Sequence, residues 1–295
     1  MTISVFITSY NQRNYLKEAI ESVLAQTLPP SQIIVVDDAS IDGSQDLISD
    51  YCRRYPGLFT PIYHQKNTGV AQARIDALKA VTGDYVTYVD GDDRYLPEKL
   101  EREAAALAAH PEACIAFSNN VYMSTDGTQY LRRWVDDEEV PQGDVFWQTF
   151  ARAFPKRSLF RMELVEYSAW KSVGFHDSRL HIYEDFDMRI RLTKRLKVTY
   201  VDEVLAEIRT HGGGLSKSNL PVHFKALDYL YRKNRALLDD LPDQVRLKIQ
   251  GMAGTWIGRI GKLAAYEAFK RLQLTEAVRL YRAGTRYLKM DSTHD

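Results

Sequence analysis

Short apolar runs alternate with segments of helical periodicity through residues 1–110, and this alternation constrains the fold more than any other feature. The segments that read as strands cover residues 3–8, 32–36, 61–64 and 85–89, and the first of them is rich in β-branched residues. Between them, apolar residues recur at spacings of three and four, as in amphipathic helices. Repeated strand–helix units of this length predict an α/β fold with a mostly parallel, Rossmann-like sheet that helices cover on both faces.

Beyond residue 110 the order of elements is less regular. We expect strands over residues 115–123, 159–167 and 199–209, helices over 168–173 and 183–195, and a polar hairpin or long loop over 124–143. From about Val222 to Met290 the sequence is helical throughout. The expected organisation is therefore a domain over 1–218, in halves of 1–110 and 111–218, and an all-helical C-terminal extension over 219–295.

The charge of the chain is balanced as a whole but unevenly distributed. Lysine and arginine together number 39, as do aspartate and glutamate, and this zero net charge argues against a nucleic-acid partner. Residues 216–295 carry 15 basic and 8 acidic side chains, net +7, whereas residues 1–215 carry 24 and 31, net −7. Such a basic tail is compatible with a solvated helix face, with peripheral contact to an anionic membrane, and with contact between the subunits of a homo-oligomer.

Three further features bear on the compartment. No stretch reaches the roughly 18 apolar residues of a transmembrane segment. The start, Met1-Thr2-Ile3-Ser4-Val5, is strand-like and lacks the basic region of a signal peptide. Cys52 and Cys114 show no metal-ligand spacing and suit a compartment in which thiols stay reduced. We expect a cytoplasmic protein, with attachment to the inner face of the membrane as an open alternative.

The tetrad Asp90-Gly91-Asp92-Asp93 follows the apolar run that ends at Val89. Its three carboxylates repel one another, and a divalent cation offsets that repulsion. Because Mg²⁺ is usually held by one or two carboxylates together with substrate phosphates, the tetrad predicts a site for a metal-bound diphosphate. The glycine lets the backbone turn sharply and lets a ligand approach. The structural alternative is a solvated acidic turn at a strand end.

Thr8 and Asp38 also fall at the ends of predicted strands, as Asp90 does. In open parallel sheets, ligands bind outside the carboxyl ends of the strands. The three positions therefore predict one binding site along this edge of the sheet.

Seven local patterns follow one another along the chain. They are Ile7-Thr8-Ser9-Tyr10-Asn11, Val35-Val36-Asp37-Asp38-Ala39-Ser40, Asn67-Thr68-Gly69-Val70-Ala71-Gln72-Ala73-Arg74, Asp90-Gly91-Asp92-Asp93, Gly174-Phe175-His176, Glu184-Asp185 and Arg209-Thr210-His211. Together they resemble the pattern of the family 2 glycosyltransferases, which are inverting enzymes with nucleotide-sugar donors and the GT-A fold. The resemblance covers residues 3 to about 218, most of the chain.

The resemblance implies roles for individual residues in binding the donor and in catalysis. It places Thr8, Tyr10 and Asp38 at the nucleobase, where Asp38 accepts a hydrogen bond from the uracil ring N–H, and Arg74 at the nucleobase or diphosphate. Asp90, Gly91 and Asp92 would contact the nucleotide sugar, and Asp90, Asp92 and His211 a Mn²⁺ or Mg²⁺ ion, with Asp93 behind these ligands. Asp37 would hold the loop, and Asp185 would be the catalytic base at the acceptor. A carboxylate base of this kind contributes about 10²–10⁴-fold to the rate.

Each of these assignments has a structural alternative. Asp37 and Asp38 could cap the turn that follows them, and Arg74 could be an exposed helix residue. Glu184-Asp185 could be acids favoured by the dipole at a helix N-terminus, and His211 could be an ordinary loop histidine.

The function implied by the resemblance is transfer of a hexose from a nucleotide sugar, expected to be a UDP-sugar, to a glycan or lipid-linked acceptor in polysaccharide biosynthesis. Residues 1–110 would bind the nucleotide and residues 111–218 the acceptor. A sugar-phosphate nucleotidyltransferase is a competing hypothesis, but the segment Thr8-Ser9-Tyr10-Asn11 lacks the glycines of its phosphate loop. A non-catalytic sugar-nucleotide-binding or scaffold protein is another, and the presence of Asp185 argues against it.

Overall fold

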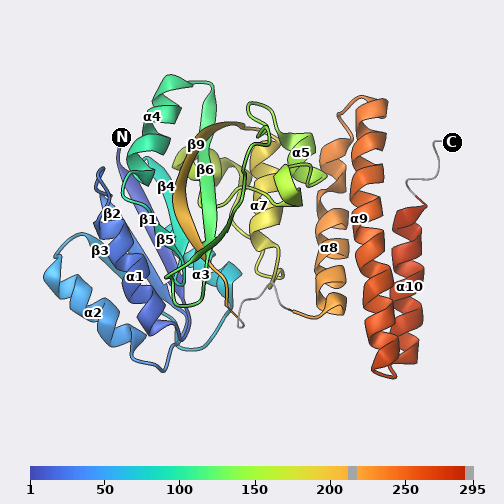
Figure 1. Cartoon of the computed structure of the whole chain (residues 1–295), viewed down its shortest axis with the longest axis horizontal. Coiled ribbons are helices and arrows are strands. Elements are labelled where there is room, and N and C mark those ends of the chain that lie inside the picture. Colours follow the sequence, from blue (N-terminus) through green and yellow to red (C-terminus); the bar gives the residue numbers. More distant parts are fainter. Residues whose placement is uncertain (212–217, 290–295) are drawn as a thin grey trace.

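The computed structural model describes residues 1–211 and 218–289 and confirms the parallel sheet predicted for the N-terminal half (Figure 1). Its first four strands are β3 (Phe59–Tyr63), β2 (Gln32–Asp37), β1 (Ile3–Ser9) and β4 (Tyr85–Asp90), in that spatial order and all parallel. Every residue of β1 and β2 is buried, as expected for strands covered on both faces. Burying one large aliphatic side chain of this kind contributes about 1.5–3 kcal/mol.

Helices connect these parallel strands. They are α1 (Arg13–Leu24), α2 (Ser44–Arg54) and α3 (Val70–Lys79), followed by α4 (Lys99–Ala109) after β4. In α1 the residues Leu16, Ala19, Ile20 and Val23 are buried, so the three- and four-residue spacing in the sequence is the face that packs on the sheet. Figure 1 shows α1 and α2 in front of this part of the sheet.

The sheet becomes mixed beyond β4. It continues through β8 (Leu164–Glu166), β6 (Ala113–Met123), β9 (Lys197–Arg209) and β5 (Arg94–Tyr95), and β7 (Tyr130–Arg133) forms the expected hairpin with β6. Only β6 and β9 pair in parallel here; β8, β5 and β7 pair antiparallel with their neighbours. The shorter helices α5 (Phe146–Phe150), α6 (Tyr167–Val173) and α7 (Glu184–Thr193) complete this half, with a 3-10 turn at Pro155–Arg157.

The strand predicted over residues 159–167 is wrong in length, because only Leu164–Glu166 joins the sheet. Met162 has a φ of 54°, which breaks the extended backbone. Its carbonyl accepts a hydrogen bond from the Thr87 hydroxyl (3.0 Å) instead of from a strand. Hydrophobicity made this segment look like a strand, but its apolar side chains fill the core without a backbone ladder.

The C-terminal extension is helical, as predicted. It contains α8 (Leu220–Asn234), a 3-10 turn (Arg235–Leu238), α9 (Asp243–Lys270) and α10 (Leu274–Leu288), which lie side by side in Figure 1. Glycines bring α9 and α10 close together: a Cβ on Gly261 would lie 2.8 Å from Gly284 Cα. Residues 212–217, directly before the predicted domain boundary, and Met290, the predicted end of the helical stretch, lie outside the described residues.

Two expectations about the chain can also be compared with the structure. Cys52 and Cys114 are both free thiols. No helix within residues 1–211 and 218–289 is long and apolar enough to cross a membrane.

Candidate active site

The acidic turn after β4 lies directly beside the end of β1. Thr8 and Asp90 are register partners in the parallel pair, and the Gly91 N–H donates to the Thr8 carbonyl (3.0 Å). A Cβ on Gly91 would lie 2.8 Å from that carbonyl oxygen, so only glycine allows the turn to approach β1 this closely. The strand-end positions identified in the sequence are therefore neighbours in space.

Arg74 is buried, so it is not the exposed helix residue of the structural alternative. Its guanidinium donates to Asp90 Oδ1 (2.7 Å), lies 3.2 Å from Glu184 Oε1 and covers the Tyr88 ring at 4.6 Å. Burial lowers the pKa of Arg74, but the charges of Asp90 and Glu184 outweigh this and raise it above its ordinary value. One cation thus joins the turn after β4 to the start of α7.

Asp92 and His211 form the second pair at this edge. Asp92 Oδ2 and His211 Nε2 are 2.6 Å apart, and the Tyr15 ring stacks on the imidazole at 5.9 Å. Burial, and then the charge of Asp90, raise the pKa of Asp92, although His211 acts in the opposite direction. The carboxylate is therefore in an environment that a cation would relieve.

The donor atoms at this edge fit a divalent ion that is shared with a substrate. Within residues 1–211 and 218–289 no three His, Cys, Asp or Glu side chains are grouped as a complete metal site. Asp92 and His211 offer one carboxylate and one imidazole, and the Asp90 carboxylate is bound to Arg74. Mg²⁺ and similar ions need few protein ligands when substrate phosphates supply the rest, so the residues present fit such an ion.

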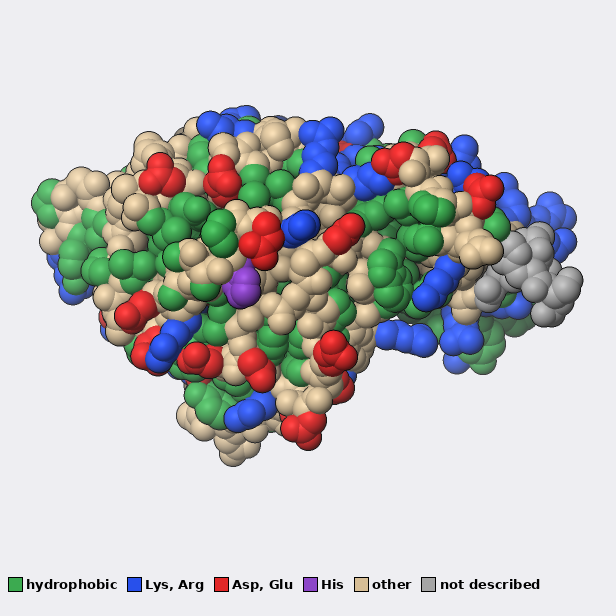
Figure 2. Space-filling view, turned by 90° about the horizontal axis from the view of Figure 1, so that it is seen from above, with side chains coloured by type: hydrophobic (Ala, Val, Ile, Leu, Met, Phe, Trp, Pro, Cys, Tyr) green, Lys and Arg blue, Asp and Glu red, His purple; other side chains and the backbone are tan. Residues whose placement is uncertain are grey.

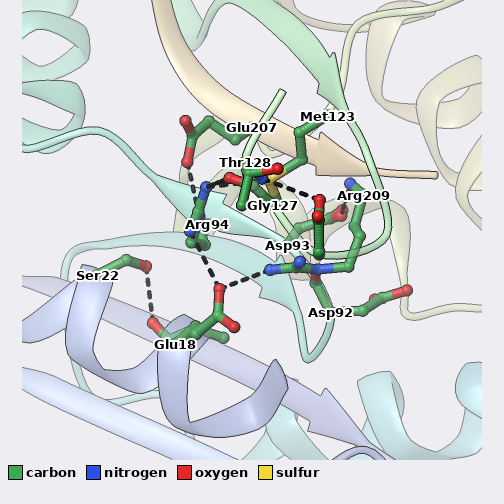
Figure 3. A network of polar contacts seen from close by, with 12 residues as sticks. Glu18, Ser22, Asp92, Asp93, Arg94, Met123, Gly127, Thr128, Glu207 and Arg209 are labelled. Atoms are coloured by element: carbon green, nitrogen blue, oxygen red, sulfur yellow. Dashed lines mark hydrogen bonds and ion pairs between the residues drawn. The ribbon is translucent and has the colours of Figure 1, made fainter. Parts of the chain in front are cut away.

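A polar network behind the turn fixes its position, as Figure 3 shows. The backbone N–H of Arg209 donates to buried Asp93 (2.7 Å). The Arg209 guanidinium donates to the Asp92 carbonyl (2.8 Å) and to Glu18 (2.6 Å). Arg94 also donates to Glu18 (3.1 Å). In Figure 3 the Asp92 side chain points away from this network.

Asp185 lies in the first turn of α7 and is bound by one arginine. Arg189, one helical turn later, donates to Asp185 Oδ2 (2.6 Å), and it also donates to Glu163 (3.0 Å) and to the Tyr88 hydroxyl (2.6 Å). The Asp185 side chain is 31% exposed, whereas that of Arg189 is 2% exposed. Burial raises the pKa of Asp185, but the charges of Arg189, Arg74 and Arg161 hold it well below its usual range.

The neighbouring Glu184 shows the opposite shift. It is buried against Arg74, and burial raises its pKa to about 7 despite that partner, with the charge of Asp185 adding to the rise. Adjacent carboxyls with opposite pKa shifts are typical of sites in which two acids have different roles. Asp185 is the ionised and more exposed member of the pair, with a side chain that is 31% exposed against 8% for Glu184.

Asp38 is more extensively hydrogen-bonded than the sequence indicated. Its Oδ1 accepts from the Thr68 N–H (2.8 Å) and hydroxyl (2.9 Å) and lies 2.7 Å from His64 Nδ1, while its Oδ2 accepts from the Gly69 N–H (2.8 Å). Burial raises the pKa of Asp38, but these hydrogen bonds outweigh it and lower the pKa. A carboxylate has about four acceptor positions, so Oδ2 can still accept one more donor.

Asp37 directly precedes Asp38, and Thr8 and Tyr10, predicted to bind the nucleobase, lie at the end of the neighbouring strand β1. Asp37 accepts from the Ser40 N–H (2.9 Å) and from Gln45 (2.8 Å), so it holds the loop as expected. Thr8 is buried, and the Tyr10 ring is 47% exposed at the end of β1. An exposed aromatic ring at this edge is available for stacking on a planar ligand.

Several residues of the site were not assigned a role from the sequence. Arg189 could have been found, because it lies at the i+4 position from Asp185 on a predicted helix. Glu163 and Glu18 could not have been found in this way, because their partners are distant in the sequence. Glu163 lies 26 residues from Arg189, and Glu18 lies 191 residues from Arg209.

Known proteins are similar to this chain in sequence. Residues 4–168 match the family model described as "Glycosyl transferase family 2". An uncharacterized protein of Mycobacterium tuberculosis is 29% identical over 269 residues, 88% of this chain and 75% of its own length. The putative teichuronic acid biosynthesis glycosyltransferase TuaG of Bacillus subtilis is 37% identical over 128 residues, 43% of this chain and 49% of TuaG.

Solved structures are similar over the whole chain. TarS of S. aureus (residues 1–349), in complex with UDP-GlcNAc, has a TM-score of 0.66 at 16% identity and covers 100% of this chain and 91% of its own. The mannosyltransferase PcManGT from Pyrobaculum calidifontis, in complex with GDP-Man and Mn²⁺, has a TM-score of 0.61 at 16% identity, with coverages of 98% and 84%. At this identity the likeness concerns the fold.

Proposed function

Because the chain belongs to glycosyl transferase family 2 and has the GT-A type of fold, we propose that it is an inverting, metal-dependent glycosyltransferase. In this proposal it moves a sugar from a nucleotide sugar, with a UDP-sugar as the expected donor, to a hydroxyl of a glycan or lipid-linked acceptor. The observation that carries the proposal is the position of Arg74, which contacts both Asp90 and Glu184. It joins the turn that would hold the diphosphate to the helix that carries the proposed base.

The donor would lie along the carboxyl ends of β1, β2 and β4. In the proposal, Tyr10 stacks on the nucleobase beside Thr8, and Asp38 uses its remaining acceptor position for the uracil N–H. Asp90 faces the ribose, with Gly91 beside it, and Arg74 holds Asp90 in place. TarS bound to UDP-GlcNAc, and PcManGT bound to GDP-Man, show that donors of this class occur on this fold.

Asp92 and His211 would hold a Mn²⁺ or Mg²⁺ ion, with Asp90 close by. When bound, the ion neutralises the charge that develops on the leaving diphosphate. Asp93 and Arg209 maintain the position of Asp92 from behind.

In the proposed reaction, the acceptor oxygen attacks the anomeric carbon on the face opposite the nucleotide. The bond from that carbon to the diphosphate oxygen breaks, its electron pair leaves with the nucleoside diphosphate, and the acceptor proton passes to Asp185. A single displacement inverts the anomeric centre, which requires one carboxylate on the acceptor side. Because arginines keep Asp185 ionised, it is in the proton-accepting form at neutral pH.

Release of the nucleoside diphosphate from a panel of UDP-sugars and GDP-mannose, with Mn²⁺ or with EDTA, tests the proposal. We expect Mn²⁺-dependent release from one donor, and Asp185→Asn to lower kcat about 10²–10⁴-fold. Asp50→Asn, on the exposed face of α2, is the matched control and keeps full activity. Unchanged turnover in Asp185→Asn would refute the base assignment, and no release from any donor would favour a non-catalytic binding protein.

A further inference from the structure

The turn between α9 and α10 exposes an unusual amount of apolar surface. Among the described residues, sixteen large hydrophobic side chains are exposed, and seven of them lie between residues 263 and 281. These seven, which we call the hairpin face, are Leu263, Tyr266, Phe269, Leu272, Leu274, Val278 and Tyr281. An apolar cluster of this kind on a water-facing surface indicates an interaction site.

The hairpin face is separate from the side chains that hold the two helices together. Ala264, Ala265, Ala268 and Leu280 are buried, so packing within the helical extension uses other faces of α9 and α10. Leu272 is the clearest case, because it follows the last residues of α9 with a φ of 59° and is 85% exposed. Glycine or asparagine is the usual choice in this conformation, so an exposed leucine here has no benefit for the fold.

Basic side chains surround the hairpin face. Residues 259–289 contain eight lysines and arginines against two glutamates, a net charge of +6, and all eight basic residues are exposed. Lys270 lies over the Tyr266 ring (4.5 Å) and Lys262 over the Tyr281 ring (5.9 Å). Figure 2 is seen from the end opposite the α9–α10 turn and shows Lys and Arg side chains on that end of the helical extension too, so the basic character extends along the helices.

We propose that the hairpin face docks the protein on the surface of a bilayer that contains anionic lipids. Exposed aromatic and leucine side chains beside lysine and arginine suit the boundary between headgroups and acyl chains, where the rings enter and the cations reach the phosphates. A second copy of the chain fits less well, because a two-fold interface places the same patch against itself. Two faces of charge +6 would then repel each other.

The position of the turn makes this docking useful to the site. β1 and β4 run toward the lower end of the molecule in Figure 1, and the α9–α10 turn lies at that same end. Docking through the hairpin face thus brings the carboxyl edge of the sheet toward the membrane surface. The docking itself stands whether or not the proposed transferase activity is correct.

Co-sedimentation of the full chain with phosphatidylcholine vesicles, with and without phosphatidylglycerol, tests this proposal without any activity assay. We expect binding to the anionic vesicles that falls as salt rises. The triple variant Lys262→Gln, Lys270→Gln, Arg282→Gln should weaken partitioning on the order of a hundredfold. The variant Tyr266→Ser, Phe269→Ser, Leu272→Ser should also lose binding, and Leu131→Ser, an exposed residue of β7, should retain it.

Light scattering and circular dichroism of the same variants complete the test. All substituted side chains are exposed, so melting temperatures should match the wild type. Equal binding to neutral and anionic vesicles, or none to either, would overturn the proposal. A dimer that becomes monomeric in the apolar variant, without vesicle binding by the wild type, would assign the hairpin face to a second copy instead.

Discussion

At the scale of single residues, Arg189 determines the ionisation and the orientation of Asp185, the proposed base. It binds Asp185 on one side and Glu163 and the Tyr88 hydroxyl on the other, so its planar guanidinium is fixed by three partners. The same contacts hold the pKa of Asp185 well below its usual range. The carboxylate is therefore always ionised at neutral pH, and its orientation rather than its titration limits its use.

Replacing Arg189 with lysine tests this positioning role. A lysine keeps the charge but has no fork with which to bind several partners in fixed directions. We expect Arg189→Lys to lower kcat by up to about a hundredfold, because small misplacements of a catalytic group have effects of this size. The KM for the donor should stay the same, since the donor residues are untouched. Steady-state kinetics separate the two parameters.

The exposed Arg102→Lys on α4 is the control for this substitution and should behave as wild type. If Arg189→Lys lowers the melting temperature but leaves kcat unchanged, Arg189 has a structural role alone.

At the scale of elements, the sequence predicted the strand ends but not the partners that hold them. Apolar runs and helical periodicity located β1, β2 and β4, and parallel strands necessarily align their carboxyl ends, which is why Thr8 and Asp90 are neighbours. The pairing of β9 with β6 and β5, and the contact of Arg209 with Glu18, join segments far apart in the chain. Local periodicity contains no information about such pairings.

Asp38 illustrates the same difference. Its place at the end of β2 was readable, but its hydrogen bonds to Thr68 and Gly69 depend on a loop 30 residues later. The short β8 and the positive φ of Met162 likewise depend on tertiary packing, which overrode the local preference for a strand.

Gly91→Ala tests whether the turn after β4 depends on contact with β1. The added Cβ would meet the Thr8 carbonyl at 2.8 Å, so we expect a loss of about 1–3 kcal/mol in the free energy of unfolding and weaker nucleotide binding. Urea denaturation and UDP titration measure the two effects. Gly57→Ala is the comparison, because its φ of 84° strains the new residue but nothing lies within 4 Å. It should lose stability and keep nucleotide binding; parallel losses of binding in both variants would contradict the contact.

At the scale of the whole molecule, the helical extension is joined to the helix that carries the proposed base. Asp187, fully buried in α7, accepts from Lys233 (2.8 Å) and Asn234 (2.8 Å) of α8. Tyr183 directly precedes α7, and its hydroxyl lies 2.9 Å from Nδ1 of His223 in α8. The division at residues 218 and 219 remains a proposal about domains, but these contacts couple the extension to the site.

Asp177 makes this coupling sensitive to acid. A hydrogen bond from Arg179 lowers the pKa of Asp177 most, and burial opposes it. Hydrogen bonds from Lys233 and Tyr229 of α8 lower the pKa further. A carboxyl with a lowered native pKa contributes stability that is complete above its unfolded value of 3.8 and is lost as pH falls through the native value. We expect Asp177→Asn to lower the free energy of unfolding by about 1.5–3 kcal/mol at neutral pH. Below pH 3.8 the variant should lose less additional stability than the wild type.

Urea unfolding of Asp177→Asn and wild type across this pH range measures the difference. Asp50→Asn, an exposed ion-pair partner on α2, is the control. Parallel stability curves for Asp177→Asn and wild type at acid pH would show that Asp177 does not link the extension to acid unfolding.

Isothermal titration of the full chain with UDP, in Mn²⁺ and in EDTA, tests the central claim most directly. That claim is that the turn after β4, joined to α7 by Arg74, binds a nucleoside diphosphate together with a divalent ion. We predict UDP binding that Mn²⁺ strengthens in the wild type, and loss of that Mn²⁺ effect in Asp92→Asn while binding in EDTA is retained. Equal UDP affinity with Mn²⁺ and EDTA in the wild type, or no UDP binding at all, would contradict it.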